Sequence, residues 1–114
     1  MSKTVFRLAA FVFTGLAATS ATAAVNFEKE VLPFITKKCV DCHKAPYTEN
    51  GQKKEPKAGL RLDASWAIIK GSENGPVLTA GAPDKSSIYE SVILPKDDDA
   101  HMPSKGEDLT KEEI

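Results

Sequence analysis

The segment Cys39-Val40-Asp41-Cys42-His43 constrains this chain more than any other feature, because Cys-x-x-Cys-His is the attachment sequence of a covalently bound c-type haem. Two thiols form thioethers with the haem vinyl groups, and the imidazole that follows binds the iron. Cys39 and Cys42 are the only cysteines among the 114 residues. The sequence therefore predicts one haem c, held by Cys39, Cys42 and His43.

Two other interpretations of the paired cysteines remain open. They could form a thiol-disulfide redox pair, or supply two of the four ligands of a zinc site. A redox pair of the thioredoxin type is expected near a βαβ pattern, and a zinc site needs a second pair of ligands. The chain shows neither pattern, and its only other histidine is His101. Haem attachment is the favoured interpretation.

The N-terminus has the pattern of an export signal. Lys3 and Arg7 precede an apolar run over residues 8–18, and small residues follow as far as Ala24. The apolar run is too short to span a bilayer comfortably, although an uncleaved anchor is the alternative. We expect residues 1–24 to be a signal peptide. Residues 25–114 should then form one small haem-binding domain in the periplasm or outside the cell.

The charge of the mature chain indicates which classes of partner to expect. Loss of the first 24 residues would leave 13 basic and 16 acidic residues, a mildly acidic balance. The chain also lacks a basic stripe with interleaved aromatic residues and a second long apolar run. We therefore expect neither nucleic-acid binding nor a membrane span in the mature domain.

The periodicity of the mature chain favours helices. Asn26 is a candidate N-cap for a helix that reaches the haem motif, within which Pro33 either introduces a kink or starts a second short helix. Residues 44–57 lack periodicity and are expected to be an exposed loop. Nothing alternates long enough for a sheet. The predicted fold class is all-α, a small helical domain around one haem.

Two further helices are expected. Asp63 is a suitable N-cap for a helix through Lys70, which Gly71 would end. Pro83 suits the first turn of a third helix, which would run to about Ile93 with a buried apolar stripe.

Met102 is the favoured second iron ligand. It precedes Pro103 and so is expected on an extended loop, from which its thioether could reach the iron opposite His43. It is the sole methionine after Met1. His101 is the alternative distal ligand, but adjacent side chains on an extended loop point apart.

Arg61 and Trp66 are candidate contacts of the haem propionates. Arg61 is the only arginine outside the predicted signal, and its guanidinium could pair with a propionate or simply be exposed. Trp66 could donate its indole N–H to a propionate or serve only as core.

The last residues predict the start of another helix. Thr110 and Glu113 have the spacing of a capping box, and Leu109 and Ile114 have that of a hydrophobic staple. A single helical turn is only marginally stable on its own. We expect the C-terminal helix to be incomplete and the chain to be part of a longer product.

Several motifs together resemble the planctomycete-type cytochrome c domain, namely the haem motif, Gly59-Leu60-Arg61-Leu62-Asp63, Gly81-Ala82-Pro83 and Met102-Pro103. The resemblance implies a small helical cytochrome c fold with His43 as proximal and Met102 as distal ligand. It also implies that such a module can stand at the front of a larger secreted or membrane-associated protein. Lys44, Ala82 and Ser104 depart from the family pattern, which bears on loop geometry and not on the iron ligands.

A haem with both axial positions filled has no open site for substrate, so the expected role is single-electron transfer to redox partner proteins of the periplasm, not catalysis. Two alternatives remain. One is the haem domain of a larger secreted enzyme or sensor with an open sixth position, and the other is a module whose haem chiefly serves folding.

Overall fold

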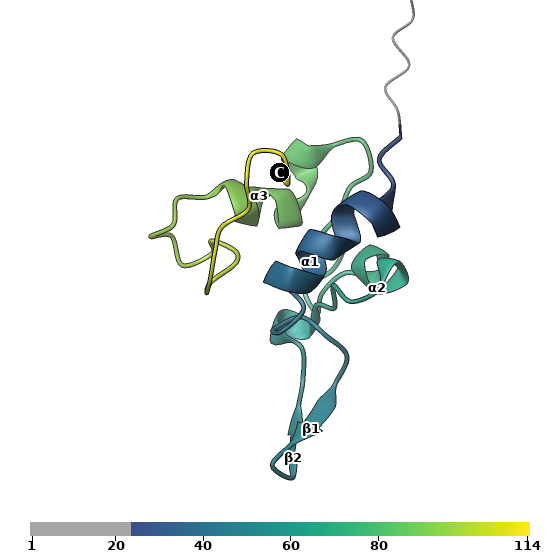
Figure 1. Ribbon diagram of the computed structural model, residues 1–114, viewed down its shortest axis with the longest axis vertical. Helices are drawn as coiled ribbons and strands as arrows, with labels where there is room; N and C mark the ends of the chain where they lie inside the picture. Colours follow the sequence, from purple (N-terminus) through teal and green to yellow (C-terminus); the bar gives the residue numbers. More distant parts are fainter. Residues whose placement is uncertain (1–23) are drawn as a thin grey trace, which may run out of the picture.

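The computed structural model describes residues 24–114, so the predicted signal peptide lies outside the described residues except for Ala24. These residues form three short α-helices and one β-hairpin (Figure 1). In chain order the elements are α1 (Leu32–Lys38), β1 (Tyr47–Glu49), β2 (Gln52–Lys54), α2 (Ser65–Lys70) and α3 (Ser87–Ile93). Single helical turns of other types cover Phe27–Val31, Lys57–Gly59 and Pro83–Lys85.

The helix before the haem motif forms in two pieces. Asn26 is its N-cap, as predicted, because its side-chain oxygen accepts a hydrogen bond from the Lys29 N–H at 3.0 Å. A wide π-helical turn follows, and α1 then begins with Pro33 in its first turn. A proline cannot donate to the preceding turn and is tolerated at a helix start. The sequence left open a kink at Pro33 or a second short helix, and the structure shows the second short helix.

The prediction of an all-α fold is wrong. An antiparallel hairpin pairs Tyr47 with Lys54, and only 34% of the described residues are helical. Asn50 and Gly51 form its turn with φ angles of +51° and +75°. Two consecutive positive φ angles match the twist of paired strands, which is why Asn-Gly is a strong hairpin signal. Each strand has three residues and is largely exposed, so no alternation of apolar residues marked it in the sequence.

Helix α2 begins one residue later than predicted and ends where predicted. Its N-cap is Ala64, because the Asp63 carboxylate is engaged elsewhere, but Gly71 ends the helix with φ +88°. A Cβ at Gly71 would overlap the backbone of Gly75 and Pro76. Only glycine fits this position without moving two stretches of backbone.

The predicted third helix is split. A 3₁₀ turn covers Pro83–Lys85, and α3 starts only after Ser86, which is 1% exposed. The Ser86 hydroxyl accepts from the Thr79 N–H and donates to the Ala82 carbonyl, so it holds the chain in a turn before α3. The predicted buried stripe on α3 is wrong, since α3 has no buried residue and Ile93 is half exposed.

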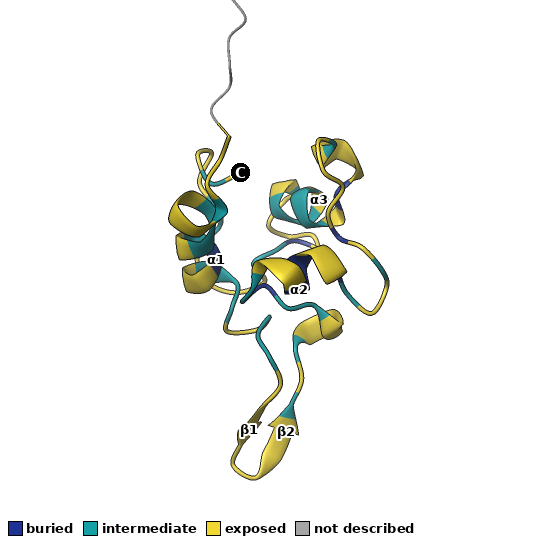
Figure 2. Ribbon diagram, turned by 90° about the vertical axis from the view of Figure 1, so that its right-hand side faces the viewer, coloured by how far each residue is buried: buried dark blue, intermediate teal, exposed yellow. Residues whose placement is uncertain are grey.

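The core is small and lies where α1 and α2 meet the segment that joins the hairpin to α2. Ile35, Leu62 and Ile68 form a buried cluster. Figure 2 shows α1 and α3 on either side, with α2 between them at the lower level and the hairpin projecting away. Partly buried residues pack around the cluster, namely Phe27, Val31, Phe34, Cys39, Val40, Leu60 and Ile88.

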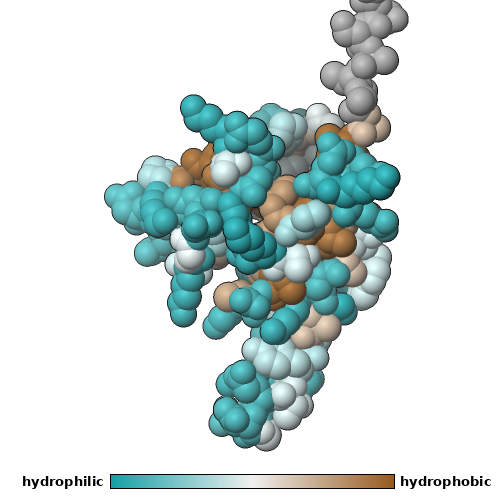
Figure 3. All heavy atoms as spheres, in the orientation of Figure 1, coloured by the Kyte–Doolittle hydropathy of each residue, from teal (hydrophilic) through white to brown (hydrophobic). Residues whose placement is uncertain are grey.

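Apolar residues gather toward the middle of the face shown in Figure 3, and hydrophilic residues cover the hairpin and the rim. Within residues 24–114, no helix has both the length and the apolar character that a bilayer crossing requires.

Candidate functional site

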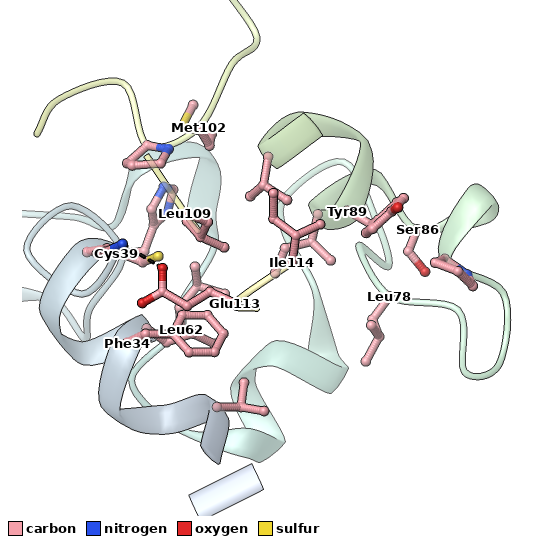
Figure 4. A pocket seen from close by; sticks show the side chains of 18 of the residues that line it. Phe34, Cys39, Leu62, Leu78, Ser86, Tyr89, Met102, Leu109, Glu113 and Ile114 are labelled. Carbon is pink, nitrogen blue, oxygen red and sulfur yellow. Dashed lines mark hydrogen bonds and ion pairs between the residues drawn. The ribbon is translucent and has the colours of Figure 1, made fainter. Parts of the chain in front are cut away.

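A cavity of about 590 Å³ separates α1 from α3, a size within the usual range for small-molecule and cofactor sites. Figure 4 shows Phe34, Cys39 and Leu62 on the α1 side and Leu78, Ser86 and Tyr89 on the α3 side. The chain end closes it further, since Leu109, Glu113 and Ile114 also line the cavity. Most of this lining is apolar, as expected for a group with a large flat hydrocarbon surface.

The haem motif lies at the end of α1 and folds as a tight turn. Cys39 is the C-cap of α1, and its carbonyl accepts from the Cys42 N–H at 3.2 Å and from the His43 N–H at 3.1 Å. This turn directs all three residues to the same cavity. Both cysteines are free thiols, Cys39 half-buried and Cys42 exposed. The two thiols that a covalent haem needs are thus adjacent and accessible.

His43 has a fixed ring orientation. Its Nδ1 lies 3.1 Å from the Leu60 carbonyl oxygen, and its own carbonyl accepts from the Leu62 N–H at 2.8 Å. A carbonyl only accepts, so this bond requires the proton on Nδ1 and leaves the lone pair on Nε2. A second partner that fixes the tautomer is typical of metal-binding histidines. The geometry of His43 therefore fits an axial iron ligand.

The dithiol interpretation finds little support in the environment of Cys39. Burial raises the pKa of the Cys39 thiol, an effect that Lys38 opposes and Glu113 reinforces. Reactive thiols of redox pairs instead have a lowered pKa. The zinc interpretation needs four ligands, and among residues 24–114 no group of three or more His, Cys, Asp or Glu side chains is placed to hold a metal ion.

Met102 lines the same cavity as the haem motif, from the loop that follows α3 (Figure 4). Its backbone N–H donates to the Ser91 carbonyl at 3.0 Å, which ties the loop to α3. The structure thus brings Met102 together with Cys39, Cys42 and His43. Ligation of iron by Met102 stays a prediction.

His101 lies apart from that group, buried and outside the cavity lining, with 6% of its surface exposed. Its Nδ1 lies 2.8 Å from the Leu94 carbonyl oxygen, and its Nε2 lies 3.2 Å from an Asp108 carboxylate oxygen. Both ring nitrogens are therefore occupied by protein groups.

Arg61 and Trp66 lie at a second, smaller cavity, between α2 and the base of the hairpin. The Arg61 guanidinium donates two 3.0 Å hydrogen bonds to the Asp63 carboxylate and stacks 4.9 Å above the Trp66 ring. This bond holds the pKa of the Asp63 carboxyl below its usual range. Trp66 is 57% exposed. The structure does not bring these two residues to the cavity of the haem motif, and their contact with a propionate stays a prediction.

An ion pair that the sequence did not predict lies in the cavity wall. Lys38 donates to the Glu113 carboxylate at 2.6 Å and to the Asp108 carbonyl at 2.8 Å, with only 7% of its side chain exposed. The predicted capping box is confirmed, because Thr110 N–H donates to Glu113 and Glu113 N–H donates to the Thr110 hydroxyl. The bond from Lys38 and then that from Thr110 lower the pKa of Glu113. The capping box pointed to Glu113, but no local pattern pointed to Lys38.

Residues 39–106 match the model of a protein family described as planctomycete cytochrome c. The match covers more than half of the chain and includes the haem motif, the Gly-Leu-Arg-Leu-Asp segment and Met102. Comparisons with curated proteins and with solved structures gave no match.

Proposed function

The chain belongs to the planctomycete cytochrome c family, and from that membership we propose that it is a domain that carries single electrons by means of one covalently bound haem. The observation that carries the proposal is the common cavity of Cys39, Cys42, His43 and Met102. The family implies covalent haem, and the apolar cavity beside two free thiols and an imidazole with a fixed tautomer fits that group.

In this proposal each residue has one task. Cys39 and Cys42 form the thioethers, His43 binds the iron through Nε2, and Met102 supplies a sulfur ligand from the opposite loop. The haem supplies one-electron exchange between ferric and ferrous iron.

The other residues of the site would tune the reduction potential of the haem. The Leu60 carbonyl accepts a hydrogen bond from the Nδ1–H of His43, which fixes the orientation of the imidazole toward the iron. Apolar side chains such as Phe34 and Leu62 exclude water from the cavity and lower the local dielectric. A methionine ligand raises the reduction potential. We therefore expect a potential above that of a protein with two histidine ligands.

Cytochrome c domains usually work outside the cytoplasm, and the proposed location here is the periplasm or the exterior, reached through residues 1–24. The proposed partners are redox proteins of that compartment, together with any further domains of a longer chain. Electron transfer to them would pass through an exposed edge of the haem, with no substrate bound at the iron.

Expression in a host that matures c-type cytochromes tests the proposal. Haem stain should survive a denaturing gel for the native chain and disappear for the double variant Cys39→Ala/Cys42→Ala. The ferric spectrum should show a methionine-to-iron charge-transfer band that Met102→Ala removes. Because Met1 would be lost on export, Met102 would be the one methionine left to give this band. Covalent haem with a five-coordinate spectrum would instead favour ligand binding or catalysis, and good export without haem would favour the dithiol interpretation.

A further inference from the structure

His101 occupies a special place in the loop that carries Met102. The loop leaves α3 at Leu94 and ends at Asp108, next to Leu109 of the cavity lining, and the buried His101 ring contacts both ends. Lys96 donates to the same Asp108 carboxylate at 3.0 Å and joins the near end of the loop to the far end. The residue beside the proposed sulfur ligand is thus a cross-link between the two ends of its own loop.

The hydrogen-bonding partners of His101 decide what the ring can do. The Leu94 carbonyl and the Asp108 carboxylate are both acceptors, and one ring nitrogen faces each of them. The ring therefore links the two ends of the loop, and it is not part of the cavity lining. We propose that His101 is a positioning residue, which holds the Met102 loop against α3 so that the thioether stays in the cavity. The inference rests on the proposed function, because it assumes that Met102 binds the iron.

The backbone beside the ring supports this role. The Met102 N–H donates to the Ser91 carbonyl in the last turn of α3, and the His101 N–H donates to the Asp98 carbonyl within the loop. Met102 is therefore fixed through its backbone on one side and through the neighbouring imidazole on the other. If the imidazole were lost, the Met102 loop would still be held to α3 by the hydrogen bond from the Met102 N–H to the Ser91 carbonyl.

The test measures how often the sulfur leaves the iron. An external ligand such as cyanide binds ferric iron only when the sulfur has dissociated, so its apparent affinity rises with the open fraction. Removal of a hydrogen-bonded group that stabilises the closed loop should raise that fraction about tenfold. We expect His101→Ala to bind cyanide about tenfold more tightly than the native haem protein. His101→Asn and His101→Gln, which each keep a donor for one partner, should have smaller effects.

Two controls separate positioning from general stability. Asp99→Ala changes an exposed residue of the same loop and should leave cyanide affinity unchanged. In a Met102→Ala background the effect of His101→Ala on cyanide affinity should vanish, because the ring acts only through the methionine. A merely structural role would leave an effect in both backgrounds.

The outcomes distinguish the two proposals. A methionine band in the native spectrum with unchanged cyanide affinity in His101→Ala and in both conservative variants would overturn the positioning role alone. A native spectrum without the methionine band would overturn the proposed ligation and this inference with it. A six-coordinate spectrum that survives Met102→Ala and is lost in His101→Gln would identify His101 as the ligand.

Discussion

The Leu60 carbonyl oxygen lies 3.1 Å from Nδ1 of His43, although the two residues are 17 positions apart. The backbone of one segment thus selects which nitrogen of another segment is available to a metal. Leu60 directly follows the Lys57–Gly59 turn, in which Ala58 and Gly59 have φ angles of +54° and +65°. The conformation of this turn therefore bears on the properties of His43, the proposed iron ligand.

Gly59→Ala should disturb that turn. An alanine at positive φ costs about 1–2 kcal/mol, and its Cβ would lie 3.2 Å from the backbone nitrogen and Cβ of Glu73. Gly51→Ala is the matched control, because Gly51 also has positive φ but faces open space. Denaturant unfolding of the haem protein should show a larger loss for Gly59→Ala, with a shift in reduction potential for this variant only. Equal losses and equal potentials would contradict the role of the turn.

Leu62→Ala should strongly destabilise the domain. Leu62 is 4% exposed and belongs to the buried cluster beside the cavity. Truncation of a buried leucine costs about 2–5 kcal/mol. Ile69→Ala, at a position 72% exposed on α2, should stay within about 0.5 kcal/mol of the native protein. A loss for Leu62→Ala no larger than that of the control would show that the cluster is not the core.

Glu113→Gln should weaken the attachment of the chain end in a way that depends on pH. The pKa of Glu113 is lowered in the folded state, so its ionised form stabilises the fold above the ordinary glutamate pKa of about 4.3. That contribution is lost as the pH falls through the lowered folded value. The native chain should therefore be more stable than Glu113→Gln at pH 7, and the difference in unfolding free energy should shrink in acid.

Glu107→Gln is the control for that experiment. Glu107 faces Lys37 at 3.8 Å, but both side chains are more than 70% exposed. Exposed pairs contribute little, so this variant should follow the native stability curve at every pH. A difference between native protein and Glu113→Gln that persists unchanged below pH 3 would argue that the Lys38 contact does not depend on the charge of Glu113.

Arg61→Gln should lower stability and leave the reduction potential unchanged. The guanidinium is paired with Asp63 at the second cavity, so its removal returns the pKa of Asp63 toward the ordinary value without changing the charge at the first cavity. Voltammetry of the haem protein checks this, with Lys70→Gln as a control that removes another positive charge at the second cavity. A fall in potential for Arg61→Gln alone would support a propionate contact.

The parts of the site that the sequence predicted are those encoded locally. The Cys39 to His43 spacing carries its chemistry within five residues, and the Asn26 cap and the Thr110 capping box each lie within one helical turn. The hairpin was also encoded locally, in Asn-Gly, but its strands are too short and exposed to show periodicity.

Long-range pairs were beyond prediction. Lys38 and Glu113 are 75 positions apart, and no periodicity links them. Asp63 was expected to cap α2, but its carboxylate accepts from Arg61 and from the Ala45 N–H. One side chain had three possible partners, and only the three-dimensional arrangement decides among them.

The small core has a consequence for the life of the protein in the cell. Within residues 24–114 the buried apolar side chains are few, namely Ile35, Leu62, Ala67, Ile68 and Val77. The apolar side chains that line the large cavity would gain packing contacts from a bulky apolar group bound between them. A chain without haem should therefore be readily cut by proteases and become resistant once haem is attached. We expect the steady-state amount of this protein to follow the supply of haem.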